Sequence, residues 1–584
     1  MDIIQLLPDN VANQIAAGEV IQRPASAVKE MLENSLDAGS TEIKVFVKDA
    51  GKTLIQVVDN GSGMSKNDLE MCFKRHATSK IKSANDLFNI KSMGFRGEAM
   101  ASIAAIAHIE VNSKLTNKEL ASRLIIEGGK IINHEDCASL NGTSIKVKNI
   151  FFNVPARRRF LKSDLVEMRH IIEEFTRVAL ANPKVKMYLY HNKKQLFQLP
   201  KSNFRQRIVN IIGDKRNETL VPINEETTIV NVTGFVGKPE SAKKTRGEQY
   251  LFVNNRFIKN HYLQHAVNKA FEEVIPSNYF PSYFIKLQLD PQLIDINIHP
   301  TKTEVKFDDE QAIYSIIRAT VKRSLGAYNI APSLDFSQEI SFDLSETNQK
   351  DVILNQPKIK IDSTYNPFDE KRDLKTRSSQ KLVTKEWEQV TLSKELESDN
   401  ELDKLSQIGN NFITVSNENG LLLIHQRRAH KRILFEHFKK FFNKQKCQSQ
   451  QLLFPKEIEL NNSELELIKE IKKDLFTLGF MFEVKNYTLV ISGIPQECQE
   501  ENLKNIIENL MEQAKNLEDL NINQKENMAR ILATSLAISK LKKLSNEEMK
   551  SLKDELLKCK SPSVCPYGKR TMINLKLIDL EKYF

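Results

Sequence analysis

A polar segment from residue 332 to about residue 395 divides this chain of 584 residues into two regions that can each fold around an apolar core. The segment is rich in Ser, Asp, Asn and Lys, and prolines recur in it at Pro332, Pro357 and Pro367. Such a sequence buries too little apolar surface to offset the conformational entropy that ordering costs, so it predicts a flexible linker. Because the chain is also longer than one hydrophobic core usually serves, we expect roughly three or four domains.

The amino-acid composition is that of an ordinary globular protein, with 40% hydrophobic and 27% charged residues. No apolar run is long enough to predict a membrane span, and the N-terminus lacks the basic start and apolar core of a secretory signal. The six cysteines are widely spaced without a C-x-x-C pair, which favours a reducing cytoplasm over a disulfide framework. The net charge of +10 permits binding to polyanions but is small for this length.

Periodic segments of both kinds predict an α+β architecture. Alternation of apolar and polar residues predicts strands at 43–47, 54–58, 412–416 and 421–425. Apolar residues at helical spacing predict helices at 25–38, 161–181 and 465–475.

Two segments near the N-terminus carry side chains suited to a nucleotide. Glu30 and Asn34 stand four residues apart and share one face of the predicted helix. A carboxylate that activates water would there lie beside an oxygen ligand for Mg²⁺. Asp59 ends an apolar strand, and Gly63 allows a tight turn after it, so this carboxylate could accept the exocyclic amine of adenine.

Two later segments offer contacts for phosphates. Gly94 and Gly97 precede a helical run at 99–107, whose N-terminus would direct N–H groups at an anion, and Lys80 lies upstream. Thr143 begins a strand with a hydroxyl that could bind a ligand. Taken singly, the four segments are equally explained by a solvated helix face, an ordinary turn and a surface loop.

Taken together, the four segments resemble the conserved boxes of the GHKL ATPases, and no Walker A sequence competes with them. The resemblance implies an N-terminal GHKL (Bergerat) ATPase sandwich that binds ATP and Mg²⁺. It implies that Glu30 is the general base, that Asn34 holds Mg²⁺ and that Asp59 recognises adenine. The other residues expected to contact the nucleotide are Gly63, Lys80, Gly94, Arg96, Gly97 and Thr143.

Within that superfamily the chain resembles the MutL-type mismatch-repair proteins, densely over 1–330 and more loosely over 405–584. The matching stretches are 13–20, 94–99, 152–158, 252–256 and 295–302. The resemblance implies a second, βαβ-type transducer domain with a ribosomal-protein-like fold, whose Lys302 would reach the γ-phosphate. It also implies an α/β C-terminal dimerisation domain. The expected boundaries are 1–205, 206–331, 332–395 for the linker, and 396–584.

The same resemblance implies a homodimeric mismatch-repair matchmaker in the bacterial cytoplasm. ATP binding and slow hydrolysis would close the N-terminal regions around duplex DNA and couple a MutS-type partner to strand removal by a separate nuclease and helicase. A linker of roughly 64 residues would span ~40–50 Å as a random coil, enough to surround a duplex. Residues expected to contact phosphates without reading sequence are Arg157, Arg158, Arg159, Arg256 and Lys259. Helix caps or a solvated surface explain these cations as well.

The C-terminal region departs from the nicking endonuclease that many MutL-type proteins carry there. Their D-Q-H-A-x-x-E-x-x-x-x-E motif corresponds to His425, Gln426, Arg427, Lys431 and Glu436, of which only the glutamine and the last glutamate match. Arginine and lysine repel divalent cations, whereas a two-metal site needs carboxylates and imidazoles.

Two further family motifs are also altered. Tyr567 replaces the histidine of C-P-H-G-R-P, and the segment 533–535 lacks a cysteine. We therefore expect no endonuclease activity. Two alternatives stay open: a rearranged metal site that uses His425 and His430, and an ATPase-poor DNA-binding scaffold. The Q-x-L-L-x-P stretch at 450–455 resembles a sliding-clamp contact, although a plain core strand explains it equally well.

Overall fold

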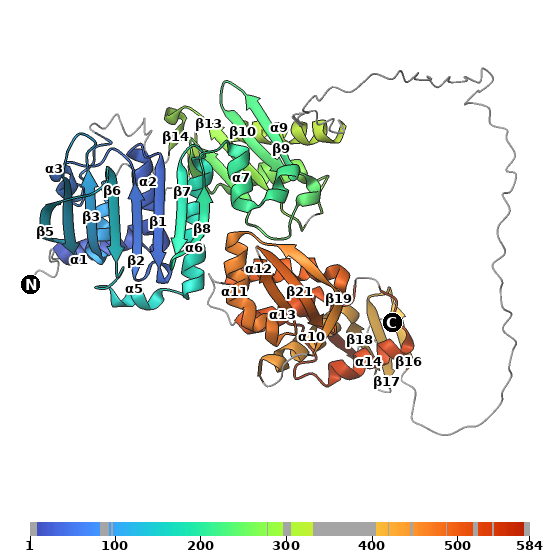
Figure 1. The fold of residues 1–584 in the computed structure, drawn as a ribbon. Coiled ribbons are helices and arrows are strands. Elements are labelled where there is room, and N and C mark those ends of the chain that lie inside the picture. Colours follow the sequence, from blue (N-terminus) through green and yellow to red (C-terminus); the bar gives the residue numbers. More distant parts are fainter. Residues whose placement is uncertain are drawn as a thin grey trace, which may run out of the picture. The chain divides into compact units, whose positions relative to one another are not determined.

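A computed structural model describes residues 9–330 and 404–576, apart from 82–92, 95–96, 277, 296–304, 418–419, 444–447, 486, 518–523 and 540–541. The predicted linker lies outside the described residues. The α+β class predicted from the sequence is confirmed by the element order (Figure 1).

The N-terminal domain is built on one eight-stranded sheet in the order β5-β4-β3-β6-β2-β1-β7-β8. Neighbouring strands are antiparallel except β1 and β7, which are parallel. The strands are β1 Glu42–Lys48, β2 Leu54–Asp59, β3 His108–Lys114, β4 Ala121–Glu127, β5 Lys130–Cys137, β6 Gly142–Lys148, β7 Lys186–His191 and β8 Lys194–Leu199. The helices are α1 Asp9–Val20, α2 Pro24–Asp37, α3 Lys66–Met71, α4 Ala99–Ile106, α5 Pro155–Phe160 and α6 Asp164–Ala181.

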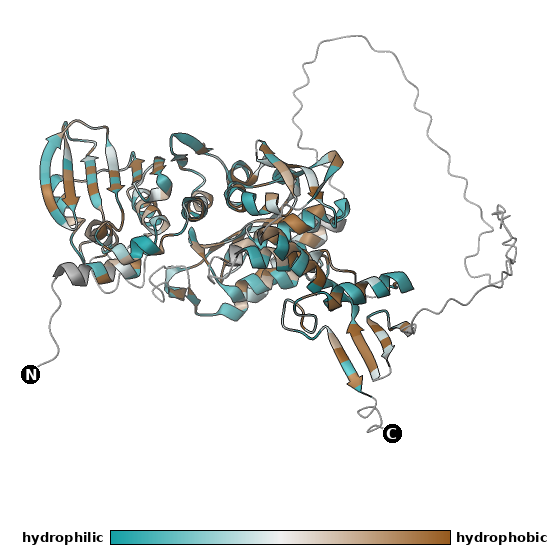
Figure 2. Cartoon of the chain, turned by 90° about the horizontal axis from the view of Figure 1, so that it is seen from below, coloured by the Kyte–Doolittle hydropathy of each residue, from teal (hydrophilic) through white to brown (hydrophobic). Residues whose placement is uncertain are grey.

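One face of this sheet forms the core of the domain. Along β1 and β2 every second residue is buried, which is the pattern that the alternation at 43–47 and 54–58 predicts. Figure 2 shows the same alternation of hydrophobic and hydrophilic residues along the strands. The predicted helices are confirmed as α2 and α6, but α6 begins at Asp164 rather than 161. Ser163 caps it by accepting the N–H of Val166.

The second domain contains a five-stranded sheet in the order β12-β11-β13-β10-β9. β11 and β13 are parallel, and α8 lies between them in the chain, so the expected βαβ unit is present. The strands are β9 Leu220–Glu226, β10 Asn231–Gly237, β11 Gln249–Val253, β12 Arg256–Ile258 and β13 Tyr283–Gln288. The helices are α7 Phe204–Ile212, α8 His261–Phe271 and α9 Glu310–Ile330, and two short strands, β14 Ile294–Asp295 and β15 Lys306–Phe307, pair separately.

The first two domains share buried surface. Phe252 and Phe284 of the second sheet belong to the same apolar cluster as the core of the first domain. Arg207 of α7 is fully buried, and its guanidinium donates to the carbonyls of Pro183 (2.7 Å) and Val185 (2.7 Å). Burial lowers the pKa of Arg207 to about 10, so it stays charged at neutral pH.

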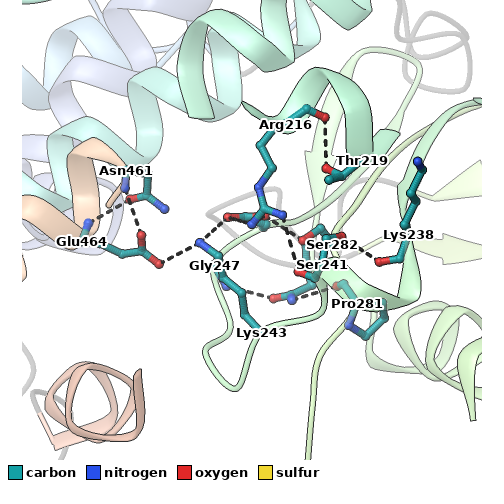
Figure 3. A network of polar contacts seen from close by, with 12 residues as sticks. Arg216, Thr219, Lys238, Ser241, Lys243, Gly247, Pro281, Ser282, Asn461 and Glu464 are labelled. Carbon is teal, nitrogen blue, oxygen red and sulfur yellow. Dashed lines mark hydrogen bonds and ion pairs between the residues drawn. The ribbon is translucent and has the colours of Figure 1, made fainter. Parts of the chain in front are cut away.

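A buried ionic network stabilises the start of β11 in the second domain. The Glu248 carboxylate accepts hydrogen bonds or ion pairs from Arg216 (2.7 Å), Lys243 (2.7 Å) and the Ser282 hydroxyl (2.7 Å). Figure 3 shows Arg216, Lys243 and Ser282 converging from separate segments. Burial alone would raise the pKa of Glu248, but Lys243 and Arg216 lower it to about 2. A charge so buried is tolerated because its oxygens are paired.

The C-terminal region has two sheets, each with its own apolar cluster. One has the order β16-β17-β18-β22 and the other β19-β21-β20. The strands are β16 Lys404–Ile408, β17 Phe412–Asn417, β18 Gly420–His425, β19 Ser449–Glu459, β20 Met481–Lys485, β21 Thr488–Pro495 and β22 Met572–Lys576. The helices are α10 Gln426–Asn443, α11 Asn462–Thr477, α12 Leu503–Leu517, α13 Gln524–Ser535 and α14 Asn546–Leu557.

The predicted elements of this region are confirmed as β17, β18 and α11. α11 begins earlier than 465 because Asn461 and Glu464 form a reciprocal capping box. None of the helices in the described residues is long and apolar enough to cross a membrane.

Replacement of a buried phenylalanine tests the core of the first domain. Phe175 of α6 is fully buried, and its ring lies 5.5 Å from that of Phe197. Phe175→Ala should lower the free energy of unfolding by about 3–5 kcal/mol because it leaves a cavity. Phe160→Ala, at a residue that is 84% exposed, should change it by less than about 0.5 kcal/mol. Equilibrium denaturation of both variants measures the difference, and equal losses would contradict this description of the core.

Candidate functional site

A cavity of about 710 Å³ opens between α2, the ends of β2 and β6, and the segments that lead into α4. This volume is typical of sites that bind small molecules. The residues predicted for a nucleotide that line it are Glu30, Asn34, Asp59, Gly63, Lys80, Gly94, Gly97 and Thr143. Arg96 and Lys302 lie outside the described residues.

Helix α2 brings Glu30 and Asn34 to one wall of the cavity. Pro24 occupies its first turn, where no N–H donor is needed, and Val28, Met31 and Leu32 on its other side are fully buried. Apolar burial therefore sets the rotation of the helix. Glu30 is only 9% exposed, so its carboxylate faces the cavity rather than bulk water.

Asp59 lines the same cavity at the point where β2 ends. Its carboxylate accepts from the Ser35 hydroxyl (2.8 Å) and the Gly61 N–H (2.9 Å). Burial raises the pKa of Asp59, while these hydrogen bonds oppose the rise. Thr143 is its partner on β6, and the Thr143 and Ser113 hydroxyls are 3.0 Å apart. This carboxylate lines the cavity, where a ligand could donate a hydrogen bond to it.

Asp37 is a functional residue that the sequence reasoning missed. It ends α2, and its two oxygens accept the N–H of Met93 (2.8 Å) and of Gly94 (3.0 Å). The Lys80 ammonium bonds both Asp37 (2.5 Å) and the Asn34 side-chain oxygen (3.0 Å). Helical spacing could have found it, because 30, 34 and 37 fall on one helix face.

Glycine is required where the backbone comes close to this network. A Cβ on Gly94 would lie 3.0 Å from the Lys80 nitrogen. Gly97 has φ +63°, and a Cβ there would lie 2.5 Å from the carbonyl oxygen of Ala77. These glycines let the chain enter α4 with its N-terminus at the cavity, as the sequence predicts.

Comparisons with known proteins identify the family. A protein called DNA mismatch repair protein MutL from Christiangramia forsetii is 46% identical over 100% of both chains. One of the same name from Flavobacterium psychrophilum is 48% identical over 100% of this chain and 99% of its own. The chain belongs to the MutL family of DNA mismatch repair proteins.

Three family descriptions match successive parts of this MutL-family chain. Residues 22–153 match the histidine kinase-, DNA gyrase B- and HSP90-like ATPase, 208–326 the DNA mismatch repair protein C-terminal domain, and 405–544 the MutL C-terminal dimerisation domain. A solved structure of the Aquifex aeolicus MutL ATPase domain complexed with ADP is 26% identical, with a TM-score of 0.36 over 47% of this chain and 94% of that one. Family membership rests on the full-length relatives.

The cations expected to contact DNA do not form one exposed set. Arg158, Arg159 and Lys259 are exposed. Arg157 is half-buried and donates to the Ile21 carbonyl (2.8 Å). Arg256 is buried, and its side chain donates to the carbonyl of Met93 (2.8 Å), so its contact with DNA stays a prediction.

The altered nuclease motifs meet in space in the C-terminal domain. The Lys431 ammonium lies 5.6 Å from the centre of the Tyr567 ring, and Thr534 donates to the Tyr567 hydroxyl (3.2 Å). Burial and the nearby Arg428 lower the pKa of His425. Among the described residues, no three His, Cys, Asp or Glu side chains are grouped as a metal site would need.

The retained Glu436 already has structural partners. Its carboxylate accepts the N–H of Lys560 (2.8 Å) and of Ser561 (3.3 Å), and it pairs with Arg432 (3.6 Å). The other histidine of the alternative metal site, His430, accepts the N–H of Ile538 through Nδ1 (3.1 Å). These contacts use both oxygens of Glu436 and one ring nitrogen of His430.

The stretch at 450–455 is not the plain core strand that was the alternative to a clamp contact. It forms part of β19, but only Leu452 is buried there, whereas Leu453 is 89% and Phe454 78% exposed. The pairing of β19 with β21 is irregular between Gln451 and Lys456. Two adjacent large apolar side chains are thus presented to solvent.

The raised pKa of Asp59 predicts a specific pH dependence of stability. Between the unfolded pKa, near 3.9, and the higher folded pKa, the folded chain binds more protons, so its free energy of unfolding falls as pH rises. Asp59→Asn cannot ionise, so it removes this fall in the free energy of unfolding. The stability of the variant relative to the parent should therefore increase as pH rises from about 4 through the folded pKa.

Denaturation of both proteins across this pH range measures the trend. Hydrogen bonds lost in the variant change the difference in the free energy of unfolding between the two proteins by the same amount at every pH. The change of that difference with pH is therefore what tests the prediction. Asp214→Asn, at an exposed aspartate, is the matched control. A difference that stays constant with pH would contradict the burial of a charged Asp59.

Proposed function

We propose that this mismatch-repair protein binds Mg²⁺·ATP in the cavity at α2 and hydrolyses it slowly. The observation that carries the proposal is that Glu30, Asn34 and Asp59 all line one cavity. A base, an oxygen ligand and an adenine acceptor then surround a cavity large enough for a small-molecule ligand. Full-length similarity to MutL proteins supports the same reading.

Each group has a distinct task in this proposal. Asp59 accepts the exocyclic amine of adenine, and Thr143 and Gly63 line the same end. Asn34 supplies an oxygen for Mg²⁺; its oxygen already accepts a cation in this structure, the Lys80 ammonium at 3.0 Å. The metal ion would supply charge neutralisation on the phosphates. Glu30 orients and deprotonates the attacking water.

Lys80, Gly94 and Gly97 would surround the phosphates, together with Arg96 and Lys302 from the segments that the structure does not describe. Lys80 must exchange part of its bonding to Asp37 and Asn34 for phosphate oxygens when ATP binds. Such a rearrangement would precede chemistry and is consistent with slow turnover.

The biological role that follows is that of a matchmaker. ATP-dependent closure of the N-terminal regions of a homodimer, paired through the C-terminal domain, would surround duplex DNA and couple a MutS-type partner to strand removal. The exposed Arg158, Arg159 and Lys259 would contact DNA phosphates independently of sequence. The exposed Leu453 and Phe454 would contact a sliding clamp. The unpaired thiols of the five described cysteines suit a bacterial cytoplasm.

Removal of the base tests the catalytic assignment. Glu30→Ala should lower kcat for ATP hydrolysis by ~10²- to 10⁴-fold, because a positioned general base contributes about that much. ADP binding should change little, because the carboxylate does not hold the nucleotide. Glu501→Ala, at an exposed glutamate of the C-terminal domain, should hydrolyse ATP like the parent. If the parent were no more active than Glu30→Ala, the chain would be an ATPase-poor scaffold.

We also propose that the chain has no endonuclease activity. Cations and an aromatic ring occupy the altered motifs, and Glu436 is engaged by backbone N–H groups. Supercoiled plasmid incubated with Mn²⁺ or Mg²⁺ should therefore stay intact while the same preparation hydrolyses ATP. Nicking that disappears in Glu436→Ala would establish a rearranged metal site instead.

A further inference from the structure

Arg256 joins the second domain to the phosphate side of the cavity. It is the first residue of β12, and it follows a turn in which Asn254 and Asn255 both have positive φ (47° and 65°). This geometry is that of a tight hairpin turn, so the direction of the following side chain is well defined. Arg256 is 8% exposed, and its guanidinium donates to the Met93 carbonyl at 2.8 Å.

Further hydrogen bonds connect Met93 to Asn34, on the wall of the cavity that α2 forms. The N–H groups of Met93 and Gly94 both donate to the Asp37 carboxylate, at 2.8 and 3.0 Å. Asp37 in turn bonds Lys80, whose ammonium reaches the Asn34 oxygen at 3.0 Å. A continuous chain of polar contacts therefore runs from a strand of the second domain to the residue proposed to hold Mg²⁺.

A cavity lies beside this chain of contacts. A small cavity of about 30 Å³, room for one water molecule, adjoins the contact and is lined by Glu33, Met93, Arg177 and Phe257. The Arg177 guanidinium lies 4.6 Å from the centre of the Phe257 ring, next to Arg256 in sequence. The β11–β12 turn is therefore joined to the first domain both by the shared core and by the hydrogen bond to Met93.

We propose that Arg256 and Asp37 are positioning residues of the ATPase, which transmit the placement of the second domain to Gly94, Lys80 and Asn34. Arg256 donates a hydrogen bond to the carbonyl oxygen of Met93. Asp37 accepts hydrogen bonds from the N–H groups of Met93 and Gly94. The proposal rests on the proposed ATP hydrolysis at this cavity. It predicts that loss of either residue disorders the phosphate-binding segment without removing the adenine end of the site.

Arg256→Ala tests this relay through the kinetics of the full-length chain. We expect kcat to fall ~10-fold or more, because small misplacements of positioning groups have large effects on rate. ADP should still bind, since Asp59 and Thr143 are unaffected, and its dissociation constant should rise by a smaller factor than kcat falls. Arg256→Lys should recover part of kcat, because an ammonium can donate one hydrogen bond to Met93.

Coupling between the two residues is measured with Asp37→Asn and the double variant. If both act through the Met93–Gly94 segment, the double variant should be no slower than the slower single variant. Independent, multiplicative losses would overturn the relay. Arg323→Ala is the matched control, since Arg323 of α9 also donates to a backbone carbonyl, that of Asn224 (3.1 Å), and should leave kcat unchanged.

Amide hydrogen exchange separates failure of the relay from failure of the proposed function. Peptides covering Met93 and Gly94 should exchange faster in Arg256→Ala than in the parent, whether or not the parent hydrolyses ATP. If the parent did not hydrolyse ATP, the proposed function would be wrong. The comparison of amide exchange between Arg256→Ala and the parent would still test the relay. Unchanged exchange there, or a folded Arg256→Ala protein with kcat within about 2-fold of the parent, would overturn the proposal.

Discussion

The burial of helix α2 is the constraint on which the nucleotide cavity depends. Val28, Met31 and Leu32 have no exposure, so the helix cannot rotate without opening the core of the first domain. Its other face then points Glu30 and Asn34 into the cavity as a consequence of packing. The direction of these two side chains is thereby fixed by apolar contacts on the other side of the helix.

Two carboxylates, Asp59 and Asp37, contribute most to the electrostatics of the cavity. Asp59 is buried, and burial raises its pKa, which is a feature that functional sites often share. Asp37 differs, because two backbone N–H groups and the Lys80 ammonium already surround it. One acid is thus suited to recognition and the other to holding the protein in place, although both lie on the same cavity.

Local patterns predicted most of the fold and part of the site. Alternation and helical spacing located β1, β2, α2 and α11, because one face of each element is buried. These patterns did not predict the hydrogen bonds of Asp37 or the burial of Arg256. Both depend on Met93, which is 56 residues from Asp37 and 163 from Arg256. A one-dimensional pattern cannot show which distant loop will meet a helix end.

Glu436 shows why a retained motif residue does not establish a retained activity. The sequence keeps this glutamate while its neighbouring metal ligands are replaced. In the structure the carboxylate accepts two backbone N–H groups, of Lys560 and Ser561, and pairs with Arg432. Both N–H groups are exposed, so water could replace the carboxylate as their acceptor. The contacts nevertheless give this glutamate a structural role that does not depend on a metal ion.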